Sequence, residues 1–288
     1  MGILWNALIN QEFFMSELLH KSPLGKNSQY ETAYNPELLF PILRSVKRKE
    51  LGIDSDSLSF YGRDLWYGYE LSWLDKQGKP VVRVALFELP CHSPHLIESK
   101  SLKLYLNSFN QSEFSDESQV RDILEKDLSG CAGEAVKVTL MNVQQLETFG
   151  FQATPGLCID DLDISVSTYS YNPDLLKKGQ GRMEETIHTH LLKSNCPVTG
   201  QPDWGTLVIE YKGDAIDHSA FLQYICSFRD HQEFHEQCVE RVFTDLQTRF
   251  EFEELTVYAQ YLRRGGLDIN PWRSTQNKMP KPVRFIRQ

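Results

Sequence analysis

The sequence predicts an α+β fold made of two similar modules, each an antiparallel sheet with a pair of helices on one face. Two segments, starting at Tyr105 and Tyr224, share the pattern Tyr-x-x-Ser-Phe, then Glu-Phe, then an amphipathic helix. Strand-like segments lie on both sides of each helical region. Strand pairs that flank a helix pair favour an antiparallel sheet over a parallel βαβ arrangement. Duplication of one module explains the repeat, and the alternative is a chance likeness of two amphipathic helices.

The expected elements follow the order strand, strand, helix, helix, strand, strand in each half. In the first half the strands are Trp66–Trp73, Val81–Phe87, Ala135–Val143 and Ile164–Tyr171. In the second half they are Glu185–Leu192, Thr206–Tyr211 and Leu255–Leu262, with a weaker candidate at Pro282–Arg287. The last long helix has an apolar face with a four-residue repeat, and Asp230 with Glu233 resembles a capping box before it. The predicted domains are 1–155, with an N-terminal extension, and 156–288.

The composition predicts a globular protein, in which any connection to nucleic acid would be through a small molecule. The 288 residues are 41% hydrophobic, which is enough to fill an ordinary core. A formal net charge of −9 argues against a surface that wraps nucleic acid, which needs excess Lys and Arg. No apolar run is long enough for a membrane span, and the N-terminus does not read as a signal peptide. The six cysteines contain no Cys-x-x-Cys pair, so we expect reduced thiols and a cytoplasmic location.

The segment Ser194–Gly205 is predicted to be a loop because it holds two prolines and two glycines between strands. A loop cysteine is more accessible than a core cysteine, so Cys196 is the best candidate nucleophile. Asp203 lies seven residues later and could turn back beside the thiol. Its anion would raise the cysteine pKa, so a useful pair would share one proton as thiolate and neutral carboxylic acid. Alternatively Cys196 has no function and Asp203 makes a turn hydrogen bond next to Pro202.

Two further segments admit both a structural and a functional interpretation. Glu236 opens the last long helix, where it could favour the helix dipole or accept two N–H bonds from a guanine-like ring. His235 could donate a proton or form a pocket wall. The strip 97–105 could be a solvated helix face. As a functional strip, it would use Lys100 to meet a phosphate and Glu98 to meet a ligand N–H.

The common nucleotide-binding signatures are missing. Gly179-Gln180-Gly181 resembles the start of a dinucleotide motif, but Glu184 stands where the third glycine belongs. The run Arg263-Arg264-Gly265-Gly266 follows a predicted strand and offers charge with close backbone approach, which would suit a phosphate. It could equally be an ordinary basic turn.

A zinc site is the less favoured interpretation of His188 and His190. The two residues alternate along a predicted strand, so their side chains face the same side, and Cys196 follows them. No further His or Cys arrives at ligand-like spacing, and half-buried strand histidines are common. We therefore expect no metal.

Three motifs together resemble the NADPH-dependent 7-cyano-7-deazaguanine reductase family, in its long two-module form. They are Glu98–Tyr105, Cys196–Asp203 and Phe234-His235-Glu236. The resemblance implies tandem tunnelling-fold modules, with active sites between modules or subunits. It implies that Cys196 is the nucleophile, Asp203 the proton donor and Glu236 the carboxylate that holds the deazaguanine. It further implies that the substrate pocket is lined by Ile97, Glu98, Ser99 and His235, and that NADPH contacts Ser99, Lys100, Arg264 and Gly265.

The activity implied by this resemblance is reduction of a nitrile to an aminomethyl group through a Cys196 thioimidate, with two NADPH per turnover and no metal. The product serves queuosine modification of tRNA, and the enzyme is expected to be a homodimer without direct nucleic-acid or membrane partners. Only the second half should supply a nucleophile, because Cys91 has no Asp at the corresponding offset. Two alternatives remain: a cyclohydrolase-like zinc hydrolase using His188, His190 and Cys196, and a non-catalytic purine-binding protein. The run Asn35–Phe40 could be a docking helix or an extension.

Overall fold

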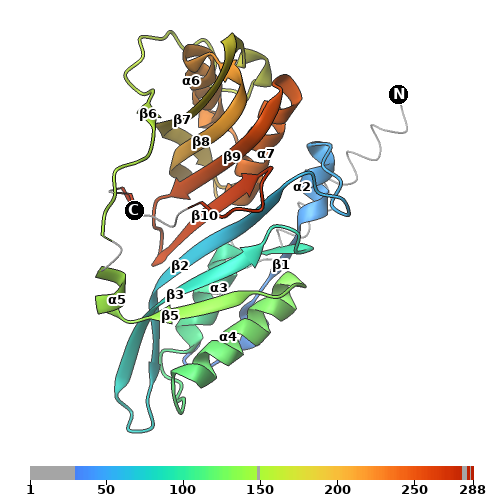
Figure 1. Cartoon of the computed structure of the whole chain (residues 1–288). Helices are drawn as coiled ribbons and strands as arrows, with labels where there is room; N and C mark the ends of the chain where they lie inside the picture. The colour runs from blue at the N-terminus through green and yellow to red at the C-terminus, as the bar shows by residue number, and fades with distance from the viewer. Residues whose placement is uncertain (1–29, 148–149, 281–283, 286) are drawn as a thin grey trace. The chain divides into compact units, whose positions relative to one another are not determined.

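The computed structural model of the chain (Figure 1) describes residues 30–147, 150–280, 284–285 and 287–288. The chain divides into two compact units. The first contains the residues up to Ser57 together with Gly68–Val143, and the second contains Leu58–Tyr67 together with Gln144–Gln288. Most of the predicted extension, residues 1–29, and part of the weak strand candidate Pro282–Arg287 lie outside the described residues. Among the helices that are described, none combines the length and apolarity needed to cross a membrane.

The first unit is a three-stranded sheet with two main helices. Its strands are the second part of β2 (Tyr61–Leu74), β3 (Pro80–Pro90) and β5 (Lys137–Met141), in the order β5-β3-β2. β3 and β5 are antiparallel. The helices are α3 (Ser99–Ser108) and α4 (Glu117–Ala132). The smaller elements are η1 (Pro36–Leu38), β1 (Pro41–Leu43), α2 (Arg44–Glu50) and β4 (His95–Ile97), and α5 (Val143–Glu147) follows β5.

The sequence of α4 shows why a helix forms there. The Asp116 side chain accepts a hydrogen bond from the Gln119 N–H and so caps the first turn. Val120, Leu124 and Leu128 are fully buried at four-residue spacing, which gives the helix one apolar face. The helix ends at Gly133, whose φ of 74° lies in the left-handed region that glycine adopts without strain.

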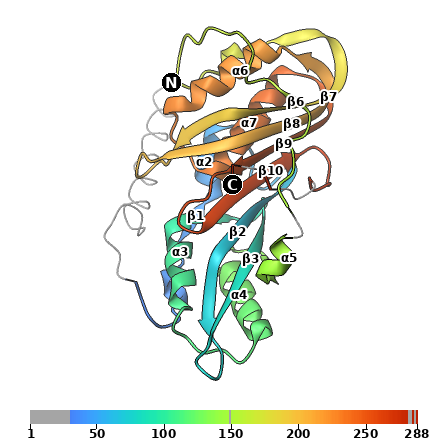
Figure 2. The same cartoon turned by 90° about the vertical axis from the view of Figure 1, so that its left-hand side faces the viewer.

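The second unit is a mixed sheet dominated by antiparallel pairs. The strands follow the order β10-β9-β8-β7-β6, with the first part of β2 beside β10. They are β6 (Leu157–Cys158), β7 (Lys178–Asn195), β8 (Pro202–Ile216), β9 (Phe252–Tyr261) and β10 (Leu267–Ser274). The β6–β7 pair is parallel. The helices are η2 (Pro173–Leu175), α6 (His218–Cys226), η3 (Ser227–Asp230) and α7 (His235–Arg249). α6 packs against β7, and α7 packs against β9 and β10 (Figure 2).

A β-bulge in β7 decides which side chains share a face of this sheet. Thr189 pairs with Leu207, but Leu192 pairs with Gly205, so two residues of β7, 190 and 191, lie opposite one residue of β8. One extra residue reverses the alternation of side chains along the strand. Thr189 and Leu192 are accordingly both buried, whereas Leu191 is exposed. Odd-numbered residues before the bulge and even-numbered residues after it therefore face the same side of the sheet.

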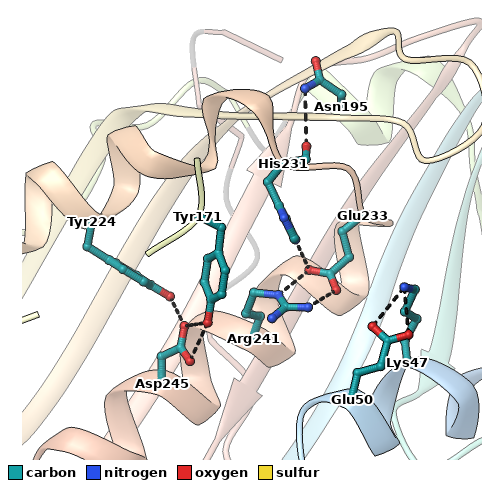
Figure 3. Close-up of polar contacts among 9 residues, drawn as sticks. All are labelled: Lys47, Glu50, Tyr171, Asn195, Tyr224, His231, Glu233, Arg241 and Asp245. Atoms are coloured by element: carbon teal, nitrogen blue, oxygen red, sulfur yellow. Dashed lines mark hydrogen bonds and ion pairs between the residues drawn. The ribbon is translucent and has the colours of Figure 1, made fainter. Parts of the chain in front are cut away.

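The two units repeat one tertiary arrangement. In the first unit, the hydroxyls of Tyr34 and Tyr105 both donate to the Asp127 carboxylate. In the second unit, the hydroxyls of Tyr171 and Tyr224 both donate to Asp245 (Figure 3). The following asparagines match as well, because Asn35 N donates to Ser108 Oγ and Asn172 N donates to Ser227 Oγ, each at 3.1 Å. The Asn35–Phe40 run is thus a 3-10 turn with a counterpart in the second unit.

The fold class is confirmed as α+β with tandem tunnelling-fold modules, but several predicted elements are wrong. Ile164–Tyr171 forms no strand; it is irregular chain that ends at the half-buried Tyr171, whose hydroxyl binds Asp245. β10 was missed because all eight of its residues are buried, polar ones included, so neither alternation nor an apolar run is visible. The proposed capping box is also absent: Phe234 caps α7 without a side-chain hydrogen bond, and Glu233 instead binds Arg241.

Candidate active site

The nucleophile candidate Cys196 begins the tight turn that joins β7 to β8. Its N–H donates to the Gln201 carbonyl at 2.9 Å, and its carbonyl accepts from the Gly200 N–H at 3.0 Å. The turn spans only residues 196–201, so the predicted loop was too long and Asp203 lies in β8. Asp203 is the register partner of Ser194, two residues before Cys196. Because paired residues share a face and so do residues two apart, the hairpin directs Cys196 and Asp203 to the same side.

Asp203 lies between two basic side chains. Its side chain is 3% exposed, its Oδ1 contacts Arg264 Nη1, and His235 Nε2 lies 3.5 Å from the same oxygen. Burial alone would raise the pKa of Asp203, but the hydrogen bonds and charges of His235 and Arg264 outweigh it and hold the pKa below its usual value. Asp203 is therefore a carboxylate at neutral pH. A role as proton donor requires that it first takes up a proton.

This ion pair predicts a pH dependence of stability. A carboxylate with a lowered folded pKa stabilises the fold above its unfolded pKa of about 3.9, and the contribution is lost as the pH falls through the folded pKa. Asp203→Asn should therefore cost about 1.5–3 kcal/mol at neutral pH, the usual range for a hydrogen bond to a charged group. The cost should shrink below about pH 4. Urea unfolding at several pH values measures it, with the exposed Asp161→Asn as control; a cost that does not change with pH contradicts the assignment.

The segment just before α7 is hydrogen-bonded to Asn195, the residue that precedes Cys196. Asn195 N donates to the His231 carbonyl at 2.8 Å, and Glu233 N donates to the Asn195 carbonyl at 3.1 Å. The Glu233 carboxylate is held in turn by Arg241 at 2.7 and 2.8 Å and by His231 Nε2 at 3.0 Å (Figure 3). Arg241 also lies over the Tyr171 ring. This network, which the sequence did not reveal, anchors the segment that leads into His235.

His235 and the two residues after it form the first turn of α7. The His235 ring packs edge-on against Tyr261, with 4.1 Å between ring centroids. Glu236 is buried in the first turn of α7, at the positive end of the helix dipole. Gln237 is also buried, and neither polar atom of its amide has a hydrogen-bond partner among the described residues. Gln237 therefore has unused hydrogen-bonding capacity beside Glu236, and sequence reasoning missed it.

The Arg264 turn is a two-glycine hairpin between β9 and β10. Arg264 N donates to the Leu267 carbonyl at 2.9 Å. Gly265 and Gly266 have φ values of 57° and 70°, the left-handed conformations that a tight hairpin of this type requires. The turn presents a guanidinium group and backbone N–H groups together, which is the donor set that phosphates bind. It therefore fits the chemistry of NADPH phosphates, although Arg264 pairs with Asp203 in this structure.

The other predicted site residues belong to the first unit, whereas Cys196, Asp203, His235, Glu236, Arg264 and Gly265 belong to the second. Ile97 ends β4, and Ser99 and Lys100 begin α3. Glu98 caps that helix: its two oxygens accept from the N–H groups of Lys100 and Ser101, each at 2.7 Å. Burial raises the pKa of Glu98 despite these bonds. Glu98 thus caps the helix, and each of its oxygens retains a lone pair that a ligand donor can use.

The hairpin of the first unit matches the Cys196 hairpin but lacks its reactive groups. Asp75 N donates to the Lys79 carbonyl and Gly78 N to the Asp75 carbonyl, each at 2.9 Å, as in the second unit. The N–H and carbonyl groups of the preceding Leu74 are hydrogen-bonded to the chain after α3, just as those of Asn195 are hydrogen-bonded to the chain after η3. Asp75 therefore occupies the place of Cys196, and Val81 follows Pro80 where Asp203 follows Pro202. The counterpart is thus Asp75 rather than the Cys91 compared from the sequence.

The group suited to a metal differs from the one considered in the sequence. The described residues place Cys158, His188 and His190 together, and Cys196 is not part of this group. Cys196 lies six residues beyond His190, about 20 Å away along an extended strand, and the β7 bulge also turns that end of the strand to the opposite face. Cys158 was missed because it lies 30 residues before His188 and reaches it by parallel pairing of β6 with β7.

Two family models match the chain. Residues 30–140 match the model described as nitrile reductase, 7-cyano-7-deazaguanine-reductase N-term, and residues 202–280 match the model described as QueF-like protein. Together they cover more than half of the chain. The chain belongs to the 7-cyano-7-deazaguanine reductase family. It has the two-module arrangement of this family of tunnelling-fold proteins and is an NADPH-dependent nitrile oxidoreductase of queuosine biosynthesis. Asp203, Glu236 and Arg264 lie within the second match, whereas Cys196 lies between the two.

Proposed function

We propose that the chain reduces the nitrile of 7-cyano-7-deazaguanine to 7-aminomethyl-7-deazaguanine through a covalent bond to Cys196. The observation that carries this proposal is the β7–β8 hairpin, which directs the Cys196 thiol to the same face as the buried Asp203 and the start of α7. A nitrile is a poor hydride acceptor, and prior addition of sulfur divides one difficult reduction into easier steps.

Asp203 moves the proton in the first step. The sulfur of Cys196 bonds to the nitrile carbon, and the thiol proton goes to the nitrile nitrogen. The product is the thioimidate R–C(=NH)–S–Cys196, and this addition involves no oxidation or reduction. Because His235 and Arg264 hold Asp203 as a carboxylate, it can take the proton from sulfur and pass it to nitrogen. His235 and Arg264, on either side of the carboxylate, keep it oriented for both transfers.

The reduction then needs two hydrides. NADPH supplies one at each of two visits, so that R–CN, two NADPH and two protons give R–CH2–NH2 and two NADP+. Arg264 and Gly265 would hold its phosphates from the second unit, and Ser99 and Lys100 would contribute from the first. Cys196 leaves as a thiolate between the two visits. The imine that remains hydrolyses in water, so the site must exclude solvent, and we propose a homodimer that encloses it.

The deazapurine ring is recognised by carboxylates. Glu236, held at the α7 N-terminus, would accept two parallel N–H bonds from the amidine edge of the ring. Ile97, Glu98, Ser99 and His235 would complete the pocket. The substrate is a free base rather than tRNA, so no direct nucleic-acid or membrane partner is needed, and we place the enzyme in the cytoplasm. No metal takes part in this reaction.

The stoichiometry of the reaction tests this proposal. Purified protein is mixed with 7-cyano-7-deazaguanine and limiting NADPH, NADPH loss is followed by absorbance, and the amine is quantified by mass spectrometry. Two NADPH should disappear per aminomethyl product. A hydrolysed product without NADPH loss would instead favour a hydrolase, and binding without turnover would favour a purine-binding protein.

A further inference from the structure

A second cluster of reactive side chains lies on the face of the second unit's sheet opposite Cys196. Cys158, His188 and His190 each offer one ligand atom, and these atoms all lie within 4.8 Å of one another. We propose that these three residues bind one thiophilic divalent ion of the zinc class, with water as a fourth ligand. The proposal goes beyond the nitrile reduction, because none of the three residues takes part in it.

The hydrogen bonds of His188 prepare it for a metal. Its Nδ1 lies 2.8 Å from the Pro155 carbonyl oxygen, which can only accept, so the ring proton sits on Nδ1. The neutral ring then carries its lone pair on Nε2, the form that binds metals. Metal-ligating histidines usually donate their other N–H to a carbonyl or carboxylate in this way. His188 is therefore already in the tautomer that a ligand needs.

His190 is prepared in a similar way. Its Nδ1 lies 2.9 Å from the Thr206 hydroxyl, and its ring centroid lies 5.2 Å from that of His188. Because Nδ1 contacts Thr206, Nε2 is the ring nitrogen of His190 left for a metal ion, and neutral imidazole is the form that binds metals.

The position of Cys158 is set by backbone contacts on both sides of it. Cys158 is the register partner of His188, and the next residue, Ile159, donates its N–H to the His188 carbonyl at 3.0 Å. Gly156 lies so close to β7 that a Cβ atom there would be 2.1 Å from the Thr186 carbonyl oxygen. The segment therefore lies flush on the edge of β7. Because the Cys158 side chain is exposed, an open coordination position would face water.

The ligand set selects the class of ion. One thiolate and two imidazoles favour Zn²⁺ and its neighbours Co²⁺, Ni²⁺ and Cu²⁺ over Mg²⁺ and Ca²⁺, which prefer oxygen. Tetrahedral bonds of about 2.0–2.3 Å need ligand atoms about 3.3–3.8 Å apart, so small side-chain rotations suffice to close the group. Bound there, the ion would tie the short strand β6 to β7 and stabilise the folded state.

Cobalt titration of the full chain tests the site. Protein freed of metal with a chelator is titrated with Co²⁺, and we expect one equivalent to give visible d–d bands with a sulfur-to-cobalt charge-transfer band. Cys158→Ser should remove the charge-transfer band, and His190→Gln should weaken binding at least about tenfold. Two serine variants, Cys131→Ser in α4 and Cys196→Ser in the active-site turn, should both retain the wild-type spectrum.

Two outcomes would overturn the proposal. One is the absence of stoichiometric binding, and the other is a charge-transfer band that survives Cys158→Ser but disappears in Cys196→Ser. A measurement on the wild-type chain tests the site even if the variants fail to fold. Iodoacetamide labelling followed by peptide mass mapping should show Zn²⁺ slowing alkylation of Cys158 at least about tenfold while labelling of Cys226 is unchanged. Equal labelling of Cys158 with and without Zn²⁺ rejects the site.

Discussion

Replacing Cys196 by alanine is expected to lower turnover of 7-cyano-7-deazaguanine by about 10⁴-fold or more, the scale of losing a nucleophile. The fold should be preserved, because Cys196 lies in a turn held by backbone hydrogen bonds that alanine keeps. Substrate should still bind, since the proposed ring contacts come from Glu236 and its neighbours. Steady-state kinetics with thermal unfolding on the same sample separates loss of chemistry from loss of folding.

Cys131→Ala is the matched control for this experiment. Cys131 lies in α4, and burial raises the pKa of its thiol to about 12, so it is not a thiolate at neutral pH. Turnover should be unchanged in this variant. Wild-type turnover by Cys196→Ala, or an equal loss in both variants, would remove Cys196 from the mechanism.

Replacing Arg273 by leucine is expected to destabilise the second unit by about 3–5 kcal/mol. The guanidinium group of Arg273 binds Asp64 and Glu240, each at 2.8 Å, and the side chains of all three residues are at most 2% exposed. Leucine would leave two carboxylates buried without their cation. Urea unfolding at neutral pH measures the loss, as a lower midpoint with an unchanged slope.

Arg121→Leu provides the surface counterpart. Arg121 pairs with Asp122 at 2.9 Å, but both side chains are well exposed, so this change should cost less than about 1 kcal/mol. Adding Asp64→Asn and Glu240→Gln to Arg273→Leu should restore part of the lost stability, because the buried charges are removed. Equal costs for Arg273→Leu and Arg121→Leu would show that the buried network is not essential.

The repeated parts of the fold were predictable because they leave local signals. The Tyr-x-x-Ser-Phe pattern contains the tyrosine that donates to a half-buried aspartate and the serine that accepts from an asparagine N–H. The match of polar positions therefore reflected shared tertiary contacts. Strand β10 was not predictable in this way, because Asp268, Asn270 and Arg273 are buried by pairing with other polar groups. Pro271 lies within β10, and a proline at such a position usually indicates that a segment is not a central strand.

The residues of the candidate site were predictable from the sequence, but the contacts between them were not. Cys196 and Asp203 were paired from the sequence, yet their common face depends on hairpin register. The contact of Arg264 with Asp203 joins residues 61 positions apart, and no local sequence pattern predicts it. The group Cys158, His188 and His190 was not predictable either, because Cys158 reaches His188 through parallel pairing of β6 with β7, a contact that leaves no local signal in the sequence.

The central claim is the covalent bond between Cys196 and the nitrile. Its most direct test is ultraviolet difference absorbance of purified protein mixed with 7-cyano-7-deazaguanine in the absence of NADPH, for wild type and Cys196→Ala. We expect a new absorbing adduct in the wild type only, and a mass increase of the intact chain equal to one substrate molecule. No adduct in either protein, with the substrate shown to bind, would contradict the thioimidate mechanism.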